Sequence, residues 1–222
     1  EDADAARERI TTSTENSAAQ EADLVVEAVP EVPDLKFSLF TELDGLCKAG
    51  AILASNTSSI SIDDIAGSTE RPDKVIGMHF MNPVPIMRLV EIVVGKETDE
   101  AVTQAVVVVA ERMGKTALCC NDSPGFISNR LLCPMLNEAV LAYEEGIADV
   151  QAIDGIMVLG MNHPIGPLAL ADLVGLDTVL HIMNVLHEGF EDDKYTPAPL
   201  LEKMVAEGKL GRKSGQGFYD YT

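Results

Sequence analysis

The segment VIGMHFMNPVPIMRLVEIVV, residues 75–94, contains two apolar runs separated by a turn with two prolines. Runs of this length and composition predict two buried strands, over 74–80 and 88–95. His79 stands near the end of the first run, and Glu91 stands inside the second, flanked on both sides by apolar residues. Burial of a carboxylate or an imidazole is costly without a partner. We therefore expect these two side chains to meet.

The segments around this stretch alternate between strand and helix patterns. Further strands are predicted over 22–31, 51–61 and 116–120, where short apolar runs end in polar turns. Helices are predicted over 34–50, 61–69 and 99–115, the first from leucines that recur on one face before Gly50. This alternation at short spacing is typical of an α/β domain with a largely parallel sheet.

The pattern changes after residue 121. Helices are predicted over 124–146, 149–160, 166–190 and 199–211, the first with Pro124 in its opening turn. We therefore expect two domains: an α/β domain over 1–121 and an all-α domain over 122–222. The first twenty or so residues are polar and predict a weak helix or a loosely held lead-in.

Charge and cysteine content exclude several classes of protein. The chain of 222 residues carries 36 acidic and 16 basic residues, a net charge of −20, which disfavours nucleic acids and anionic membranes as partners. Cys47, Cys119, Cys120 and Cys133 form no C-x-x-C pair and are expected to be reduced, small apolar residues. No metal site, membrane span or signal peptide is predicted, and the expected location is cytoplasmic.

Polar side chains follow the predicted strands at the point where ligands bind in open α/β sheets. Ser58 lies in the polar turn that ends the segment 51–61, His79 stands at the end of the next strand, and Asn82 follows it. The pattern suggests a histidine base that Glu91 orients and stabilises when protonated. Asn129 lies on an otherwise apolar helix face, so it either contacts a substrate or joins two helices by hydrogen bonds. A lone histidine is more often structural, and that simpler interpretation stays open from the residues alone.

Five motifs together resemble the L-3-hydroxyacyl-CoA dehydrogenase family, and in particular its 3-hydroxybutyryl-CoA members. They are ASNTSSISI, GMHFMNPVPIMRLVEIV, DSPGFISNRLL, HPIGPLALADLVGLDT and GRKSGQGFYDY. The resemblance as a whole runs from about residue 22 to the C-terminus. The resemblance implies a Rossmann-type NAD-binding domain and a helical domain that dimerises and helps to bind an acyl-CoA substrate. It implies NAD-dependent oxidation of an L-3-hydroxyacyl-CoA to the 3-ketoacyl-CoA, or the reverse reduction of acetoacetyl-CoA, as in fatty acid β-oxidation.

The resemblance also implies roles for particular residues. His79 would be the general base, Glu91 its orienting partner, and Ser58 and Asn129 the contacts to the reacting oxygen. The residues implied to touch NAD are Ala28, Glu31, Lys36, Ser58, Asn82 and Lys213. The family opens with a strand, a G-x-G-x-x-G turn and a helix. We expect this sequence to begin inside the nucleotide-binding domain, after that first βαβ unit.

Two alternatives remain. One is a related dehydrogenase that acts on a free hydroxy acid or a sugar acid. The other is a catalytically silent fragment that persists as a helical dimerisation module. Comparing activity on acetoacetyl-CoA with activity on free hydroxy acids distinguishes the first alternative from an acyl-CoA dehydrogenase. Dimers that do not bind NAD would indicate the second. The C-terminal GRKSGQGFYDY has a simpler interpretation as a tail turn whose aromatic residues pack on the body of the protein.

Overall fold

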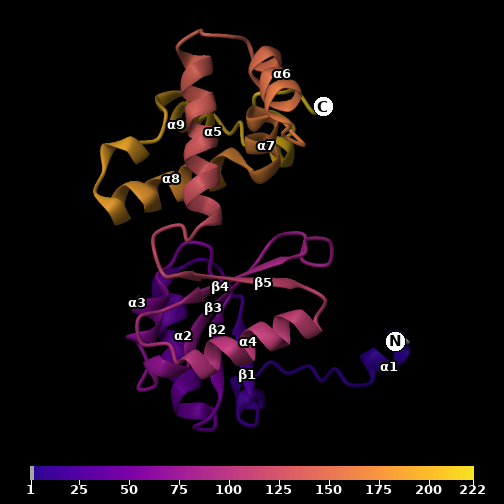
Figure 1. Cartoon of the computed structure of the whole chain (residues 1–222), viewed down its shortest axis with the longest axis vertical. Coiled ribbons are helices and arrows are strands. Elements are labelled where there is room, and N and C mark those ends of the chain that lie inside the picture. Colours follow the sequence, from indigo (N-terminus) through magenta and orange to yellow (C-terminus); the bar gives the residue numbers. More distant parts are fainter. Residues whose placement is uncertain (1–2) are drawn as a thin grey trace. The chain divides into compact units, whose positions relative to one another are not determined.

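A computed structural model describes residues 3–222, and the chain divides into two compact units, Glu1–Asp122 and Ser123–Thr222. The first unit contains α1 (Ala3–Arg7), η1 (Asn16–Ala19), β1 (Leu24–Glu27), α2 (Pro33–Leu46), β2 (Ile52–Ser55), α3 (Ile62–Ala66), η2 (Pro72–Lys74), β3 (Val75–Phe80), β4 (Leu89–Val94), α4 (Glu100–Arg112) and β5 (Thr116–Asn121). The second contains α5 (Ser128–Glu144), α6 (Val150–Met161), α7 (Pro167–Val174), α8 (Leu176–Phe190), η3 (Asp193–Tyr195), α9 (Pro199–Ala206) and η4 (Arg212–Ser214). Figure 1 labels the main elements.

The strands of the first unit form one sheet in the order β1-β2-β3-β4-β5. All neighbouring strands are parallel except β3 and β4, which are antiparallel. The largely parallel sheet is therefore confirmed, and the antiparallel pair follows from the short connection between β3 and β4, which cannot hold a crossover helix.

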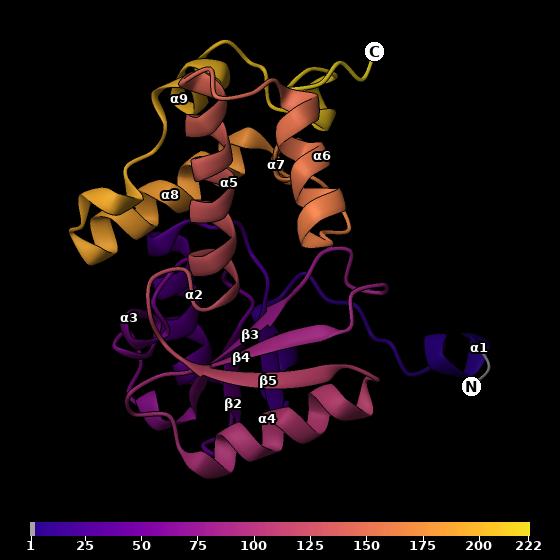
Figure 2. The ribbon, with the colours of Figure 1, turned by 45° about the horizontal axis from the view of Figure 1, so that its top comes forward.

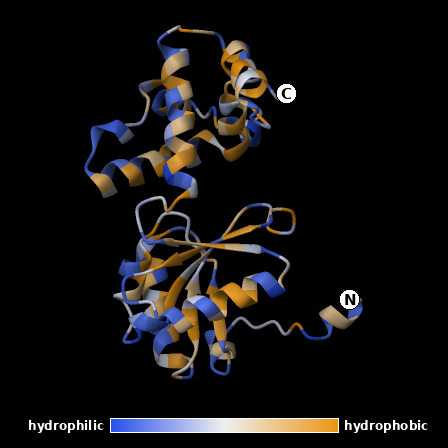
Figure 3. Cartoon of the chain, in the orientation of Figure 1, coloured by the Kyte–Doolittle hydropathy of each residue, from blue (hydrophilic) through white to orange (hydrophobic). Residues whose placement is uncertain are grey.

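Helices cover both faces of this sheet. In Figure 2, α4 lies along one face, while α2 and α3 lie on the other. Val102, Val106 and Ala110 of α4 pack against strand residues such as Met78 and Ile92. The strands between these helices are mostly apolar, and Figure 3 draws much of their length in orange.

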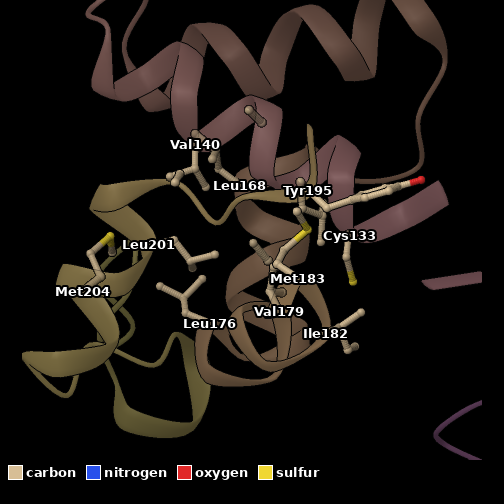
Figure 4. Close-up of a cluster of buried hydrophobic side chains, with 14 of the residues drawn as sticks. Cys133, Val140, Leu168, Leu176, Val179, Ile182, Met183, Tyr195, Leu201 and Met204 are labelled. Carbon is tan, nitrogen blue, oxygen red and sulfur yellow. The ribbon is translucent and has the colours of Figure 1, made fainter. Parts of the chain in front are cut away.

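The second unit has a separate apolar core. Figure 4 shows this cluster, in which Leu136 of α5, Leu168 of α7 and Leu176, Val179 and Met183 of α8 are fully buried. Burial of apolar surface, at about 25 cal/mol per Å², is the main favourable contribution to such a helical core. The expected α/β Rossmann-type domain followed by an all-α domain is thereby confirmed.

Several predicted helices are longer than the observed ones, such as that over 199–211, which ends at Ala206, and two of the differences have a clear backbone cause. The helix predicted over 124–146 begins only at Ser128, because Gly125 and Phe126 have positive φ angles of 71° and 51°, so Pro124 lies in the preceding turn. The helix predicted over 166–190 is two helices that meet at Gly175, whose φ of 103° is incompatible with a continuous helix.

The four cysteines differ in their exposure. All four thiols are unbridged, but only Cys47 and Cys133 are buried, while Cys119 is exposed and Cys120 is half-buried. Both lie on β5, which is an edge strand in this sheet with one face partly open.

Candidate active site

Three parallel strands end at the same edge of the sheet. Since β1, β2 and β3 are parallel neighbours, their carboxyl ends lie side by side at that edge. Asn56 joins two of these ends, because its side-chain oxygen accepts a hydrogen bond of 2.8 Å from the Phe80 backbone N–H. Ser58, Ala28 and Asn82 follow the three strands, so the structure brings them to the edge where ligands bind in this class of sheet.

His79 and Glu91 face each other across the antiparallel pair β3 and β4. They are direct register partners, and the His79 Nδ1 lies 3.0 Å from the Glu91 Oε2. Both residues are buried, with 6% and 4% of their surface exposed. A carboxylate can only accept, so Nδ1 carries the proton and Nε2 is the basic nitrogen of the ring. The expected meeting of these side chains is confirmed, and it provides an oriented imidazole with a charged support.

The second oxygen of Glu91 has a neighbour that the sequence did not indicate. The Cys120 thiol on β5 lies 3.8 Å from the Glu91 Oε1, at the distance of a weak S–H···O hydrogen bond. Cys120 is not a register neighbour of Glu91 but lies diagonally on the adjacent parallel strand, where Glu91 pairs with Leu118. The carboxylate is thus held from both sides, by β3 and by β5.

Glu31 fixes the turn that carries Ser58. Its Oε1 accepts hydrogen bonds from the Thr57 hydroxyl at 2.5 Å, the Ser58 N–H at 2.8 Å, and the Ser59 N–H at 2.9 Å and hydroxyl at 3.0 Å. Burial raises the pKa of the Glu31 carboxyl, but these donors and the nearby Lys36 ammonium outweigh it and hold the pKa below its ordinary value. The turn that ends β2 is therefore built around one ionised carboxylate.

A buried ion pair lies behind Glu31. The Lys36 Nζ contacts the Glu27 Oε1 at 2.7 Å and the Glu31 Oε2 at 3.4 Å, and it donates to the Val29 carbonyl at 3.2 Å. Glu27 also accepts from the Val29 N–H and the Ser55 hydroxyl, both at 2.6 Å. Glu27 and Lys36 are almost completely buried, with 3% and 1% exposed. We call Glu27, Lys36 and Glu31 the acidic triad.

Glu27 is the residue of this site that the sequence analysis missed. It stands in LVVEAV, flanked by apolar residues in the same way as Glu91 in LVEIVV. The same pattern, a glutamate flanked by apolar residues, predicts burial of Glu27 as it does of Glu91. Lys36 was expected to touch NAD, whereas its ammonium is enclosed by Glu27, Glu31 and the Val29 carbonyl.

Asn129 and Lys213 belong to the second unit. Asn129 is half-buried in the first turn of α5. The Lys213 ammonium forms an ion pair with Asp177 in the first turn of α8. The C-terminal tail packs on α7, where the buried Asp172 accepts from the Phe218 and Tyr219 N–H groups and the Tyr221 hydroxyl, each at 3.0 Å. The interpretation of the tail as a turn packed on the body is confirmed.

Residues 3–222 contain neither a cluster of metal ligands nor a single membrane-spanning helix. No group of three or more His, Cys, Asp or Glu side chains in that range is placed to hold a metal ion. In the same range, no single helix has both the length and the apolarity to cross a bilayer, and α7 and α8 reach them only as a pair bent by 96°.

Comparisons with known proteins agree along nearly the whole chain. The family profile described as "3-hydroxyacyl-CoA dehydrogenase, NAD binding domain" matches residues 1–123, and the one described as "3-hydroxyacyl-CoA dehydrogenase, C-terminal domain" matches residues 125–221. A probable 3-hydroxybutyryl-CoA dehydrogenase of Deinococcus radiodurans is 57% identical over 96% of this chain and 77% of the relative. The crystal structure of (S)-3-hydroxybutyryl-CoA dehydrogenase from Ralstonia eutropha is 49% identical, with a TM-score of 0.96 over 99% of this chain and 77% of that one.

Proposed function

The chain belongs to the 3-hydroxyacyl-CoA dehydrogenase family, and from this premise we propose that it interconverts an L-3-hydroxyacyl-CoA and the 3-ketoacyl-CoA with NAD as cofactor. The relatives named as 3-hydroxybutyryl-CoA dehydrogenases favour the four-carbon pair, 3-hydroxybutyryl-CoA and acetoacetyl-CoA. The observation that carries the proposal is the buried His79–Glu91 pair at the carboxyl edge of the sheet.

His79 acts as the general base in the oxidation. Its Nε2 takes the proton of the substrate hydroxyl while the hydrogen on the same carbon leaves with its electron pair and the carbonyl forms. Glu91 stabilises the imidazolium and keeps Nδ1 protonated through the 3.0 Å contact. Bound NAD supplies the acceptor for the hydride. In the reverse reduction, His79 returns the proton to the oxygen.

Ser58 and Asn129 contact the reacting oxygen in this proposal. The Glu31 carboxylate holds the backbone of Ser58 in place, so the hydroxyl starts from a fixed position. Hydrogen-bond donors that are positioned before the reaction stabilise the charge that develops on oxygen. Asn129 would serve the same oxygen from the start of α5, as the resemblance implies.

The exposed groups at the sheet edge fit the nicotinamide half of NAD. Ala28 and Asn82 are exposed, Ser58 and Glu31 are half-exposed, and all four follow strands that end at one edge. Hydroxyl, amide and backbone groups of this kind suit a carboxamide and ribose hydroxyls, which need both donors and acceptors. In the proposed division of roles, residues 1–121 bind NAD, residues 122–222 bind the acyl-CoA, and Lys213 extends the cofactor contacts.

The helical unit is proposed to form a homodimer. On α6, Ile156 and Leu159 are 61% and 88% exposed, beside a surface hollow lined also by Ala152, Gly155 and Gly160. Figure 3 shows α6 as one of the most apolar helices of the chain. Contiguous exposed apolar surface of this kind marks a protein interface. The reduced cysteines support a cytoplasmic location for the assembly.

The proposal is tested by following NADH oxidation with acetoacetyl-CoA beside free acetoacetate, with the full-length protein. Turnover of the thioester alone is expected. Preference for the free acid would identify a dehydrogenase of hydroxy acids, and NADH consumption with neither compound would favour a silent dimerising module. The mass measured by light scattering then decides whether that module is dimeric.

A further inference from the structure

The acidic triad contains more negative than positive charge. Lys36 contributes one cation, while Glu27 and Glu31 contribute two carboxylates, so the sum is −1. Glu27 accepts hydrogen bonds from the Lys36 ammonium, the Val29 N–H and the Ser55 hydroxyl, a set of donors that suits a carboxylate. Since Glu27 and Lys36 are enclosed by protein, water screens this charge much less than it screens surface charges.

The triad lies next to the place where the cofactor changes its own charge. Hydride transfer needs the carbon that gives up the hydride to lie about 3–3.5 Å from the nicotinamide carbon that accepts it. In the proposed function, the donor carbon bears the oxygen that Ser58 contacts. The Ser58 N–H is 2.8 Å from the Glu31 Oε1, so in the proposed function the triad is hydrogen-bonded to the residue that contacts the reacting oxygen. The nicotinamide ring is a cation in NAD⁺ and neutral in NADH.

We propose that the acidic triad, Glu27–Lys36–Glu31, sets the preference of the site for oxidised over reduced cofactor. The inference rests on the proposed function. A net negative charge stabilises the cationic ring and leaves the neutral ring unaffected, so it favours NAD⁺ over NADH at equilibrium. The charge therefore shifts the equilibrium between the bound reactants toward NAD⁺ and the hydroxyacyl thioester. Glu27 acts through Lys36 and Glu31 and is a positioning residue.

The triad also connects this charge to the geometry of the turn. Glu27 reaches the turn along two routes, through Lys36 to Glu31 and through the Ser55 hydroxyl, which accepts from the Thr57 N–H at 3.2 Å. A purely structural ion pair would affect the binding of NAD⁺ and NADH equally, since both need the same turn. A charge effect changes the ratio of the two affinities.

The test is a titration of the full-length protein with NAD⁺ and with NADH, separately, by calorimetry. The measured quantity is the Kd for NADH divided by the Kd for NAD⁺. Glu27→Gln keeps the shape and removes one negative charge, and we expect this ratio to fall roughly three- to tenfold. Glu31→Gln, at a half-exposed and therefore more tolerant position, removes the same charge and should lower the ratio similarly.

Lys36→Met is the matched control. It removes the cation, so the triad stays at −1 if Glu27 takes up a proton and reaches −2 if it does not. In neither case should the ratio fall, even where both affinities weaken. The His79–Glu91 pair is unchanged in all variants and cancels from the comparison.

An unchanged ratio in folded Glu27→Gln and Glu31→Gln, or an equal fall in Lys36→Met, would overturn the inference. These outcomes differ from failure of the proposed function, in which the unaltered protein binds neither NAD⁺ nor NADH.

Discussion

The chemistry of this site depends on three carboxylates that are held in different ways. Glu91 supports a histidine, Glu31 holds a turn, and Glu27 neutralises a buried lysine. Each has at least one hydrogen-bonding partner inside the protein, which offsets the cost of burying a carboxyl group. Identical side chains therefore have distinct roles because their partners differ.

Loss of the charge on Glu91 should impair the base. In Glu91→Gln, the amide no longer stabilises the imidazolium and can bind the wrong ring tautomer. We expect kcat/KM to fall about 10²-fold or more. The acid limb of the pH–rate profile for oxidation should also move to lower pH, because the protonated ring has lost its counter-charge.

Cys120→Ala is the control for that prediction. It removes the weak thiol contact to the other Glu91 oxygen without changing any charge. Its kcat/KM and pH profile should stay near those of the unaltered protein. An unshifted acid limb in Glu91→Gln would show that the carboxylate does not act on the base.

Glu31 should make folding sensitive to acid. Its folded-state pKa is lowered from an ordinary value of 4.5, chiefly because its hydrogen bonds outweigh the cost of burial. The resulting stability is fully present above pH 4.5 and is lost as pH falls through the lower folded-state value. The free energy of urea unfolding, measured between pH 6 and pH 3, should fall more steeply for the unaltered protein than for Glu31→Gln. Parallel curves would contradict this.

At the scale of elements, the strand pattern predicted the sheet well and the helix pattern predicted boundaries poorly. Strand pairs such as β3 and β4 follow from apolar runs that only a covered sheet can bury. The break at Gly175 and the late start of α5 depend on single backbone angles that apolar periodicity does not encode. The burial of Lys36 could not be read from α2, since its partners lie on β1 and beyond.

The C-terminal tail packs so closely against α7 at Gly217 that a side chain there would clash. A Cβ added to Gly217 would lie 1.9 Å from the Asp172 Oδ1, which accepts a hydrogen bond from the Phe218 N–H of the tail. Gly217→Ala should therefore lower the free energy of unfolding by about 2 kcal/mol or more. The measurement is chemical denaturation followed by tyrosine fluorescence.

Gly45→Ala is the matched control, at an exposed position in the last turn of α2 with nothing within 4 Å of the added Cβ. It should be neutral or stabilise by up to about 1 kcal/mol. Equal effects of the two substitutions would show that the close approach at Gly217 has no energetic consequence.

For the molecule as a whole, the proposed dimer depends on α6. Leu159→Glu places a charge on its most exposed apolar side chain, so the protein should become monomeric by light scattering. Met113→Glu, at a 53% exposed position at the end of α4, should leave the mass unchanged. A dimeric Leu159→Glu variant would place the interface elsewhere.

The central claim is that His79 is the base of an NAD-dependent hydroxyacyl-CoA dehydrogenase. The most direct measurement is the rate of NADH oxidation with acetoacetyl-CoA for the full-length protein and for His79→Gln, with NADH affinity measured on both. We predict that the substitution lowers kcat by about 10²-fold or more while NADH still binds. A variant that keeps most of its turnover would contradict the account.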